Sequence, residues 1–292
     1  MNAKPKILVT GSNGQLGKEL KALEFAYPQF DLVFLSREDM PIHHFELVRN
    51  TFKAHQPNYL INCAAYTAVD KAESEKELAF QVNAEAVGVL AAVCKEHDCR
   101  FIHISTDYVF DGNATLPYKE EARTNPQGVY GASKLEGEKQ AVELNPDSII
   151  IRTSWVYSEF GKNFVKTMLK LMSEREELNV VYDQVGSPTY AADLAETILR
   201  IISNCQLSIG NWRPGIYHYS NDGIISWYDF AVAIRELSRS TCKINPISTA
   251  EYPTTAKRPA YSVLDKVKIQ RVLNIELKGW RESLKNCLQR MQ

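Results

Sequence analysis

The stretch Lys6–Gly17, which reads KILVTGSNGQLG, decides the fold class of this chain. Its first five residues are mostly branched and apolar, which favours a buried strand. Glycines follow at once at Gly11, Gly14 and Gly17, and apolar positions at helical spacing begin at Gln15. Glycines between a strand and a helix let backbone amides approach a pyrophosphate at the helix N-terminus. The stretch therefore predicts a dinucleotide-binding turn, the alternative being a plain glycine-rich turn.

The segments after this turn repeat the alternation of strand and helix. Their strands are short runs of consecutive apolar residues, a pattern typical of a parallel sheet covered by helices on both faces. We therefore predict a Rossmann-type, doubly wound α/β fold. The predicted strands are Lys6–Thr10, Asp31–Leu35, Tyr59–Asn62, Arg100–Ser105 and Ser148–Arg152, and the predicted helices are Gln15–Leu23, Phe45–His55, Lys76–His97 and Tyr130–Leu144.

The pattern changes after about residue 153, where prolines, aromatic residues and longer connections become frequent. Helices are still expected at Phe164–Ser173, Ala191–Ser203 and Trp227–Leu237, the last with Ser226 as its N-cap and Asp229 in its first turn. We predict a dinucleotide-binding domain over residues 1–153, to which later segments contribute strands. Residues 154–292 are predicted to form a smaller C-terminal α/β substrate-binding lobe.

Composition argues against several classes of protein. The net charge of the 292 residues is −1 and the charges are mixed along the chain, so no basic block is present to bind nucleic acid. The first apolar run is too short for a signal peptide or a membrane span. The six cysteines lack disulfide-motif and zinc-site spacing and are expected to be buried free thiols. We expect a cytoplasmic monomer or homodimer without nucleic-acid or membrane partners.

Tyr130 and Lys134 are the candidate catalytic pair. Their i, i+4 spacing places both side chains on one face of a predicted helix. A tyrosine has an ordinary pKa of about 10, and a nearby ammonium group stabilises the phenolate, which makes the hydroxyl a better proton donor. Such pairs are common by chance, but Ser105 and Thr106 end the preceding strand and bring a hydroxyl to the same crevice. This order of elements is that of the short-chain dehydrogenases/reductases.

The end of the second predicted strand bears on the choice of cofactor. An acidic residue there would bind the adenosine ribose, whereas Arg37 can pair with a 2′-phosphate. The sequence therefore favours NADPH, with NADH possible. The alternative is that Arg37 is a solvated surface residue and that Glu38 or Asp39 approaches the ribose.

Longer segments around these motifs narrow the match to one family. They are Ala64–Glu73 (AAYTAVDKAE), Ser105–Gly112 (STDYVFDG), Tyr130–Glu138 (YGASKLEGE), Arg152–Tyr157 (RTSWVY), Asp183–Thr189 (DQVGSPT) and Arg258–Asp265 (RPAYSVLD). Over nearly its whole length the chain resembles the dTDP-4-dehydrorhamnose reductases, which are extended short-chain dehydrogenases/reductases. The resemblance implies reduction of the C4 ketone of dTDP-4-dehydro-L-rhamnose to dTDP-L-rhamnose by NADPH or NADH.

The resemblance also implies roles for individual residues. Tyr130 would be the proton donor, Lys134 its partner, and Thr106 a hydrogen-bonding group near the reacting oxygen. The substrate candidates are Thr106, Asp107 and Trp155, with Asn163, Gln184 and Arg258 as further candidates, although Arg258 fits a surface salt bridge nearly as well. The cofactor candidates are Gly11, Gly14, Gln15, Leu16, Gly17, Arg37, Ala64, Ala65, Tyr66, Tyr130 and Lys134.

One position departs from the family pattern, and another matches only part of a metal site found in some relatives. Pro41 replaces an aspartate that relatives often place near the adenosine, which leaves the cofactor preference open. Glu19 matches one carboxylate of a magnesium site in some relatives, but no complete set is found, so Mg²⁺ stays a possibility only.

Two other functions are alternatives to the reductase. A nucleotide-sugar epimerase shares the fold, whereas a dehydratase would need a carboxylate where Tyr108 stands. A non-catalytic subunit resembling the methionine adenosyltransferase β subunit is the other alternative.

Overall fold

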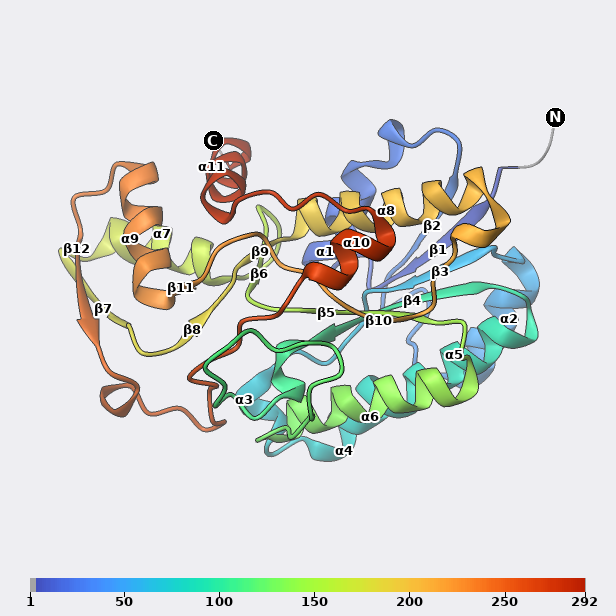
Figure 1. The fold of residues 1–292 in the computed structure, drawn as a ribbon, viewed down its shortest axis with the longest axis horizontal. Coiled ribbons are helices and arrows are strands. Elements are labelled where there is room, and N and C mark those ends of the chain that lie inside the picture. The colour runs from blue at the N-terminus through green and yellow to red at the C-terminus, as the bar shows by residue number, and fades with distance from the viewer. Residues whose placement is uncertain (1–3, 292) are drawn as a thin grey trace.

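The predicted strands form one parallel sheet, completed by a sixth strand from the second half of the chain (Figure 1). The computed structural model describes residues 4–291. Because β2 lies on one side of β1 and β3 on the other, the β1–β3 boundary is the switch point where such sheets bind ligands. The strand order is β2 (Asp31–Leu35), β1 (Lys6–Thr10), β3 (Tyr59–Asn62), β4 (Arg100–Thr106), β5 (Ile149–Thr153) and β10 (Gly215–His218).

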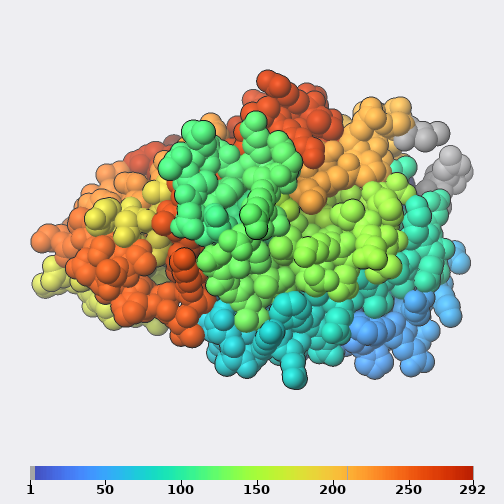
Figure 2. All heavy atoms as spheres, turned by 60° about the horizontal axis from the view of Figure 1, so that its bottom comes forward, coloured from blue at the N-terminus to red at the C-terminus, as the bar shows by residue number. Residues whose placement is uncertain are grey.

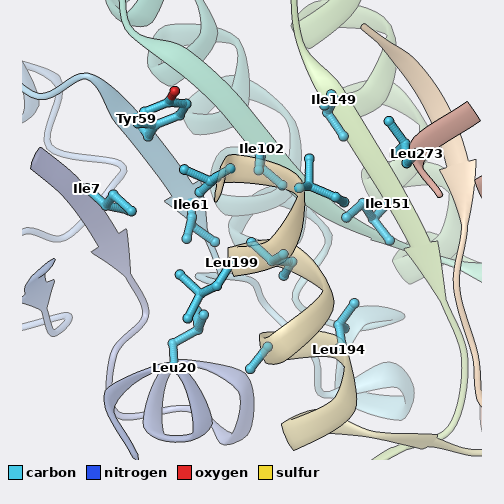
Figure 3. Packing of buried hydrophobic residues seen from close by; sticks show 14 of the residues in the cluster. Ile7, Leu20, Tyr59, Ile61, Ile102, Ile149, Ile151, Leu194, Leu199 and Leu273 are labelled. Carbon is cyan, nitrogen blue, oxygen red and sulfur yellow. The ribbon is translucent and has the colours of Figure 1, made fainter. Parts of the chain in front are cut away.

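Helices cover both faces of this sheet, which confirms the doubly wound α/β prediction. One face carries α1 (Gln15–Ala22), α8 (Ala191–Leu207) and α10 (Val267–Leu273), and the other α2 (Phe45–His55), α5 (Ala86–Glu96) and α6 (Val129–Leu144). Alternate strand residues point to opposite faces, so Ile7 and Ile61 pack beneath α8 while Leu8 packs beneath the other layer. Figure 3 shows Leu194 and Leu199 of α8 meeting the strand isoleucines.

The predicted helix over Lys76–His97 is wrong in one respect, because a π-helical turn at Gln81–Glu85 divides it into α4 (Lys76–Phe80) and α5. The π turn brings Asn83 inward, where its amide bonds both backbone groups of Tyr66. Apolar spacing alone does not reveal this turn. By composition Lys76–Glu96 is also apolar enough to span a membrane, but 56% of its apolar window is buried in the protein. The cytoplasmic location stays a prediction.

The C-terminal half is interleaved with the sheet rather than appended to it. Its α8, β10 and α10 pack on or join the sheet, while the remaining elements form a separate group at one end (Figure 1). The predicted cap of α9 is confirmed, since Ser226 and Asp229 form a capping box. The division at residue 153 stays a prediction. The end group contains α7 (Phe164–Glu174), α9 (Trp227–Ser238), α11 (Trp280–Arg290) and the pairs β6 (Val156–Tyr157) with β9 (Thr189–Tyr190), β7 (Glu177–Val181) with β12 (Lys243–Ile247), and β8 (Val185–Gly186) with β11 (Ile225–Ser226).

Short helical elements lie in the connections. The most informative is the 3₁₀ turn η3 (Asp107–Val109), which follows β4 directly. The others are η1 (Glu24–Ala26), α3 (Val69–Ala72), η4 (Ile209–Asn211) and η5 (Thr249–Glu251).

Candidate active site

The glycine loop closes onto the end of β3. Gly11 has a φ of +64°, and a Cβ built on it would lie 2.6 Å from the backbone nitrogen of Ala64, so both conformation and contact require glycine. The Gly14 amide donates to the Gly11 carbonyl at 2.9 Å, and α1 begins one residue later. This tight turn places the helix N-terminus at the switch point, where it can hold an anionic group.

A cavity of about 480 Å³ opens beside this loop and has the size of a small-ligand site. Six predicted cofactor residues line it, namely Gly11, Gly14, Arg37, Ala64, Ala65 and Tyr66. Lys71, Glu38 and His43 line it too, and the sequence analysis did not assign Lys71 or His43 to it. Among the open alternatives, Asp39 accepts a hydrogen bond from the Ser36 amide at 2.9 Å and serves the turn instead.

Five of the predicted cofactor residues do not line this cavity, namely Gln15, Leu16, Gly17, Tyr130 and Lys134. Gln15 accepts a hydrogen bond from Asn163 at 2.8 Å and so ties α1 to the C-terminal half. Leu16 is buried in the core, and Gly17 packs closely against the backbone of Gly11 and Ser12. Their proposed contact with a cofactor stays a prediction.

Tyr130 and Lys134 project from the first turns of α6 toward the end of β4. Lys134 is only 2% exposed, and its amine donates to the Ile104 carbonyl at 2.7 Å. Burial lowers the pKa of Lys134 to about 8, against the opposing effect of Glu138. Burial raises the pKa of Tyr130, while the neighbouring Thr106 hydroxyl favours its phenolate. The structure therefore brings all three predicted catalytic residues together.

Thr106 and Asp107 form the turn that ends β4. The Thr106 hydroxyl donates to Asp107 Oδ1 at 3.0 Å and accepts from the Tyr108 amide at 3.2 Å. Asp107 is 3% exposed and its Oδ2 has no hydrogen-bond partner. Burial raises the pKa of this carboxyl to about 6. A buried carboxylate oxygen without a partner beside Tyr130 is suited to receive a ligand hydroxyl.

Trp155 closes the same region from the C-terminal half. It adopts a φ of +49°, an uncommon conformation for a bulky residue. Its ring stacks on Trp227 with centroids 3.6 Å apart. A Cβ on Gly186 would meet both the Trp155 ring, at 2.7 Å, and the Ser262 hydroxyl, at 2.8 Å. Because the Ser262 hydroxyl also lies near enough to Asp107 to lower the pKa of its carboxyl, Ser262 lies between the two predicted substrate residues.

The further substrate candidates are engaged within the protein. Asn163 caps α7 through the Lys166 amide at 3.1 Å, and Gln184 donates to the Thr249 hydroxyl at 3.1 Å. Arg258 forms an ion pair with Asp70, although its Nη1 is buried without a partner. The C-terminal segment that carries Arg258 bonds Asp70, and Figure 2 shows such orange C-terminal residues against the cyan part of the sheet domain. Contact of Asn163, Gln184 and Arg258 with the substrate stays a prediction.

A polar network that the sequence analysis did not identify lies behind the catalytic pair. Glu138 forms a bidentate, buried ion pair with Arg152 and accepts from the Ser105 hydroxyl. His103 and Asn62 continue the network toward β3. The spacing of Glu138, four residues after Lys134, was the available signal, since it places the carboxylate on the same helix face.

The predicted magnesium carboxylate is paired with an arginine instead. Glu19 accepts from the Ser158 hydroxyl at 2.6 Å and lies 3.2 Å from Arg290 Nη1. Burial raises the pKa of Glu19. Within residues 4–291, no group of three or more His, Cys, Asp or Glu side chains could hold a metal ion. The residues around Glu19 therefore do not fit a metal site. The six cysteines are free thiols, as expected.

The fold and this site define a short-chain dehydrogenase/reductase of the extended type. The family model for the RmlD substrate binding domain matches residues 5–292. A dTDP-4-dehydrorhamnose reductase of Aggregatibacter actinomycetemcomitans is 42% identical over 288 residues, covering 96% of this chain and 97% of that protein. This chain belongs to the dTDP-4-dehydrorhamnose reductase family.

Solved structures agree with this assignment. A dTDP-4-dehydrorhamnose reductase from Clostridium acetobutylicum is 42% identical with a TM-score of 0.93, covering 98% of this chain and 99% of that one. Another, from Bacillus anthracis and solved in complex with NADP, is 37% identical with a TM-score of 0.92, covering 99% of this chain and 100% of that one.

Proposed function

We propose that this chain reduces the C4 ketone of dTDP-4-dehydro-L-rhamnose to give dTDP-L-rhamnose. The observation that carries the proposal is the convergence of Tyr130, Lys134 and Thr106 at the carboxyl end of β4. Family membership supports this choice of substrate, because similar proteins are named dTDP-4-dehydrorhamnose reductase. An intact set of proton-transfer groups favours an enzyme over a non-catalytic subunit.

The chemistry assigned to the chain is proton transfer and orientation. A bound nicotinamide cofactor supplies the hydride. Tyr130 donates its hydroxyl proton to the ketone oxygen, and the Lys134 ammonium stabilises the phenolate that remains. A pKa of about 8 leaves most of Lys134 protonated at neutral pH yet able to exchange its proton. Asp107 and Trp155 orient the sugar nucleotide.

Loss of the Tyr130 hydroxyl tests the mechanism directly. The Tyr130→Phe variant should lose turnover by about 10²–10⁴-fold, the usual contribution of a general acid, while cofactor affinity stays near normal. The measurement is the absorbance of the reduced nicotinamide during incubation with the keto-sugar nucleotide. If the unmodified protein consumes no NADPH, the reductase function is wrong. Interconversion of sugars without net NADPH consumption would indicate an epimerase instead.

We further propose that NADPH is the preferred cofactor, with Arg37 as the main contact of the 2′-phosphate. Arg37 and Lys71 place two cations in the cavity beside the glycine loop. Their placement suits an additional phosphate because charge-assisted hydrogen bonds from arginine to phosphate are strong. The NADP-bound relative from Bacillus anthracis supports a cofactor of this kind.

Replacement of Arg37 separates the two cofactors. The Arg37→Ala variant should lose about tenfold in kcat/KM with NADPH, the loss expected for one charge-assisted contact, and little with NADH. Arg49→Ala is the matched control, because Arg49 pairs with Glu96 on the surface and does not line the cavity. An equal loss with both cofactors would remove Arg37 from the 2′-phosphate site.

A further inference from the structure

A buried chain of polar side chains runs behind Lys134, from β3 across β4 to α6. His103 is fully buried, and its Nε2 lies 3.2 Å from the Lys134 amine. Its Nδ1 lies 3.0 Å from the amide nitrogen of Asn62, which is also fully buried. Asn62 Oδ1 in turn accepts from the Thr10 hydroxyl at 2.6 Å and from the Ala64 amide at 3.2 Å.

The backbone fixes the direction of the hydrogen bond between Asn62 and His103. The Ala64 N–H can only donate, so the atom of Asn62 that faces it is the carbonyl oxygen. The other end of the Asn62 amide must then donate to His103 Nδ1. A neutral imidazole that accepts at Nδ1 carries its proton on Nε2, which faces Lys134. Protonation of both ring nitrogens would oppose two N–H donors between His103 and Asn62.

We propose that His103 is a positioning residue for Lys134, a permanently neutral imidazole whose Nε2–H donates to the amine form of this lysine. This proposal rests on the proposed function, because the proton transfer of that reaction is what gives the amine form of Lys134 a role. After Tyr130 has lost its proton to the ketone oxygen, the Lys134 ammonium passes a proton to the phenolate. His103 then holds the resulting amine by its lone pair until a solvent proton restores the ammonium.

The surroundings of this pair are consistent with such a role. Burial and the neighbouring Lys134 both lower the pKa of His103, so the ring stays uncharged. The charged groups facing Lys134 are Glu138 on its own helix, which is neutralised by Arg152 of β5, and Asp107 beyond Tyr130. Protonated Lys134 cannot accept from His103, so the His103 contact favours the uncharged amine.

Nitrogen-15 NMR of histidine-labelled protein tests the tautomer without any substrate. His103 should show a protonated Nε2 and an unprotonated Nδ1 throughout the range between about pH 6 and pH 9, although free histidine titrates near 6.5. The His103→Gln variant identifies its resonances by their loss, and His55→Gln, on α2, is the matched control. An Nδ1–H tautomer, or a ring that becomes charged in this range, would overturn the proposal.

The Asn62→Asp variant should reverse the chain. A carboxylate accepts from both sides, so His103 must protonate Nδ1 and present Nε2 as an acceptor to the Lys134 ammonium. We expect kcat to fall at alkaline pH as Lys134 loses its proton, and in this variant that fall should move up by about one pH unit or more. The His103 resonances should report the opposite tautomer. An unchanged tautomer in folded Asn62→Asp protein would contradict the proposal. If this variant does not fold, the spectrum of the unmodified protein decides alone. A protein with the expected tautomer but no NADPH consumption would disprove the reductase function only.

Discussion

The two walls of the candidate active site differ in how their polar groups are satisfied. Behind Tyr130 and Lys134, buried side chains from β3, β4, β5 and α6 are hydrogen-bonded in two groups, one with Asn62 and His103 and the other with Glu138 and Arg152. The second wall is formed by the turn after β4 and the C-terminal segments near it, where Asp107 and Arg258 each keep one buried polar atom without a partner. Trp155 there adopts an unusual backbone conformation and is half-buried.

This difference separates two tasks of the molecule. Hydrogen bonds in the first wall hold its side chains in fixed geometry, so the proposed proton transfer needs little reorganisation. Unpaired buried groups cost folding free energy unless a ligand satisfies them. Under the proposed function, the first wall contributes stability and proton transfer, whereas the second gives up stability for substrate recognition. Substitutions in the two walls should have opposite effects on the free energy of unfolding.

The largest expected effect is in the wall behind the catalytic pair. Glu138→Ala leaves Arg152 as an uncompensated buried charge, so it should lower the free energy of unfolding by about 3–5 kcal/mol. Urea unfolding at pH 7 measures the change. The control is Glu96→Ala, which breaks the exposed ion pair with Arg49 and should cost less than about 1 kcal/mol. Equal losses in both variants would mean that the buried ion pair contributes no more to the free energy of unfolding than the exposed one.

The second wall should respond in the other direction. The pKa of Asp107 is raised from its ordinary value of 3.8 to about 6, so the folded protein binds the proton more tightly than the unfolded chain. The unmodified protein therefore loses stability as pH rises from about 4 to about 6. Asp107→Asn lacks this loss, and it should be more stable than the unmodified protein by about 1–3 kcal/mol at pH 7.

The same comparison at low pH supplies the control. Near pH 4 the Asp107 carboxyl is protonated in the folded state, so the advantage of Asp107→Asn in urea unfolding should largely disappear. The substrate KM of this variant should rise, since Asp107 is a proposed contact of the sugar nucleotide. An advantage of the same size at both pH values would show that ionisation of Asp107 is not its cause.

The smallest effect concerns aromatic contact with the substrate. Trp155→Ala should raise the KM for the sugar nucleotide by about tenfold, because a well-placed aromatic contact is worth about 1 kcal/mol or slightly more. Its kcat should fall less, since Tyr130 and Lys134 keep their places. Trp227→Phe is the matched variant, which keeps an aromatic ring beneath Trp155. A fall in kcat alone would place Trp155 in the chemistry instead.

The sequence predicted the layers of the sheet domain but not their fine structure. Consecutive apolar runs and the glycine loop are local signals, and β1 to β5 were found within one residue of their predicted bounds. The sixth strand, β10, was expected only as an unspecified later contribution, because its pairing with β5 is set by packing over a long separation. The π turn around Asn83 was missed for a similar reason. It is stabilised by bonds to Tyr66 and Ser133, which are distant in sequence.

The candidate site divides in the same way. Tyr130, Lys134 and Thr106 lie in motifs with fixed spacing, and the structure brings them together. His103 and Asn62 were not identified because their partners lie on neighbouring strands, and strand register is invisible in one sequence. The possible magnesium site at Glu19 gains no support, because Arg290, more than 270 residues away, supplies positive charge beside this carboxylate.

Because β10 comes late in the sequence, it is synthesised long after β5, and this affects how the nascent chain folds. While the nascent chain emerges from the ribosome, β5 has no neighbour on its outer edge until residues Gly215–His218 have been made. The apolar underside of the sheet likewise waits for α8, whose Leu194 and Leu199 cover it. Exposed edges and apolar faces promote aggregation of incomplete chains. Fragments that stop at residue 153 should therefore aggregate, although they carry the complete glycine loop and both Tyr130 and Lys134.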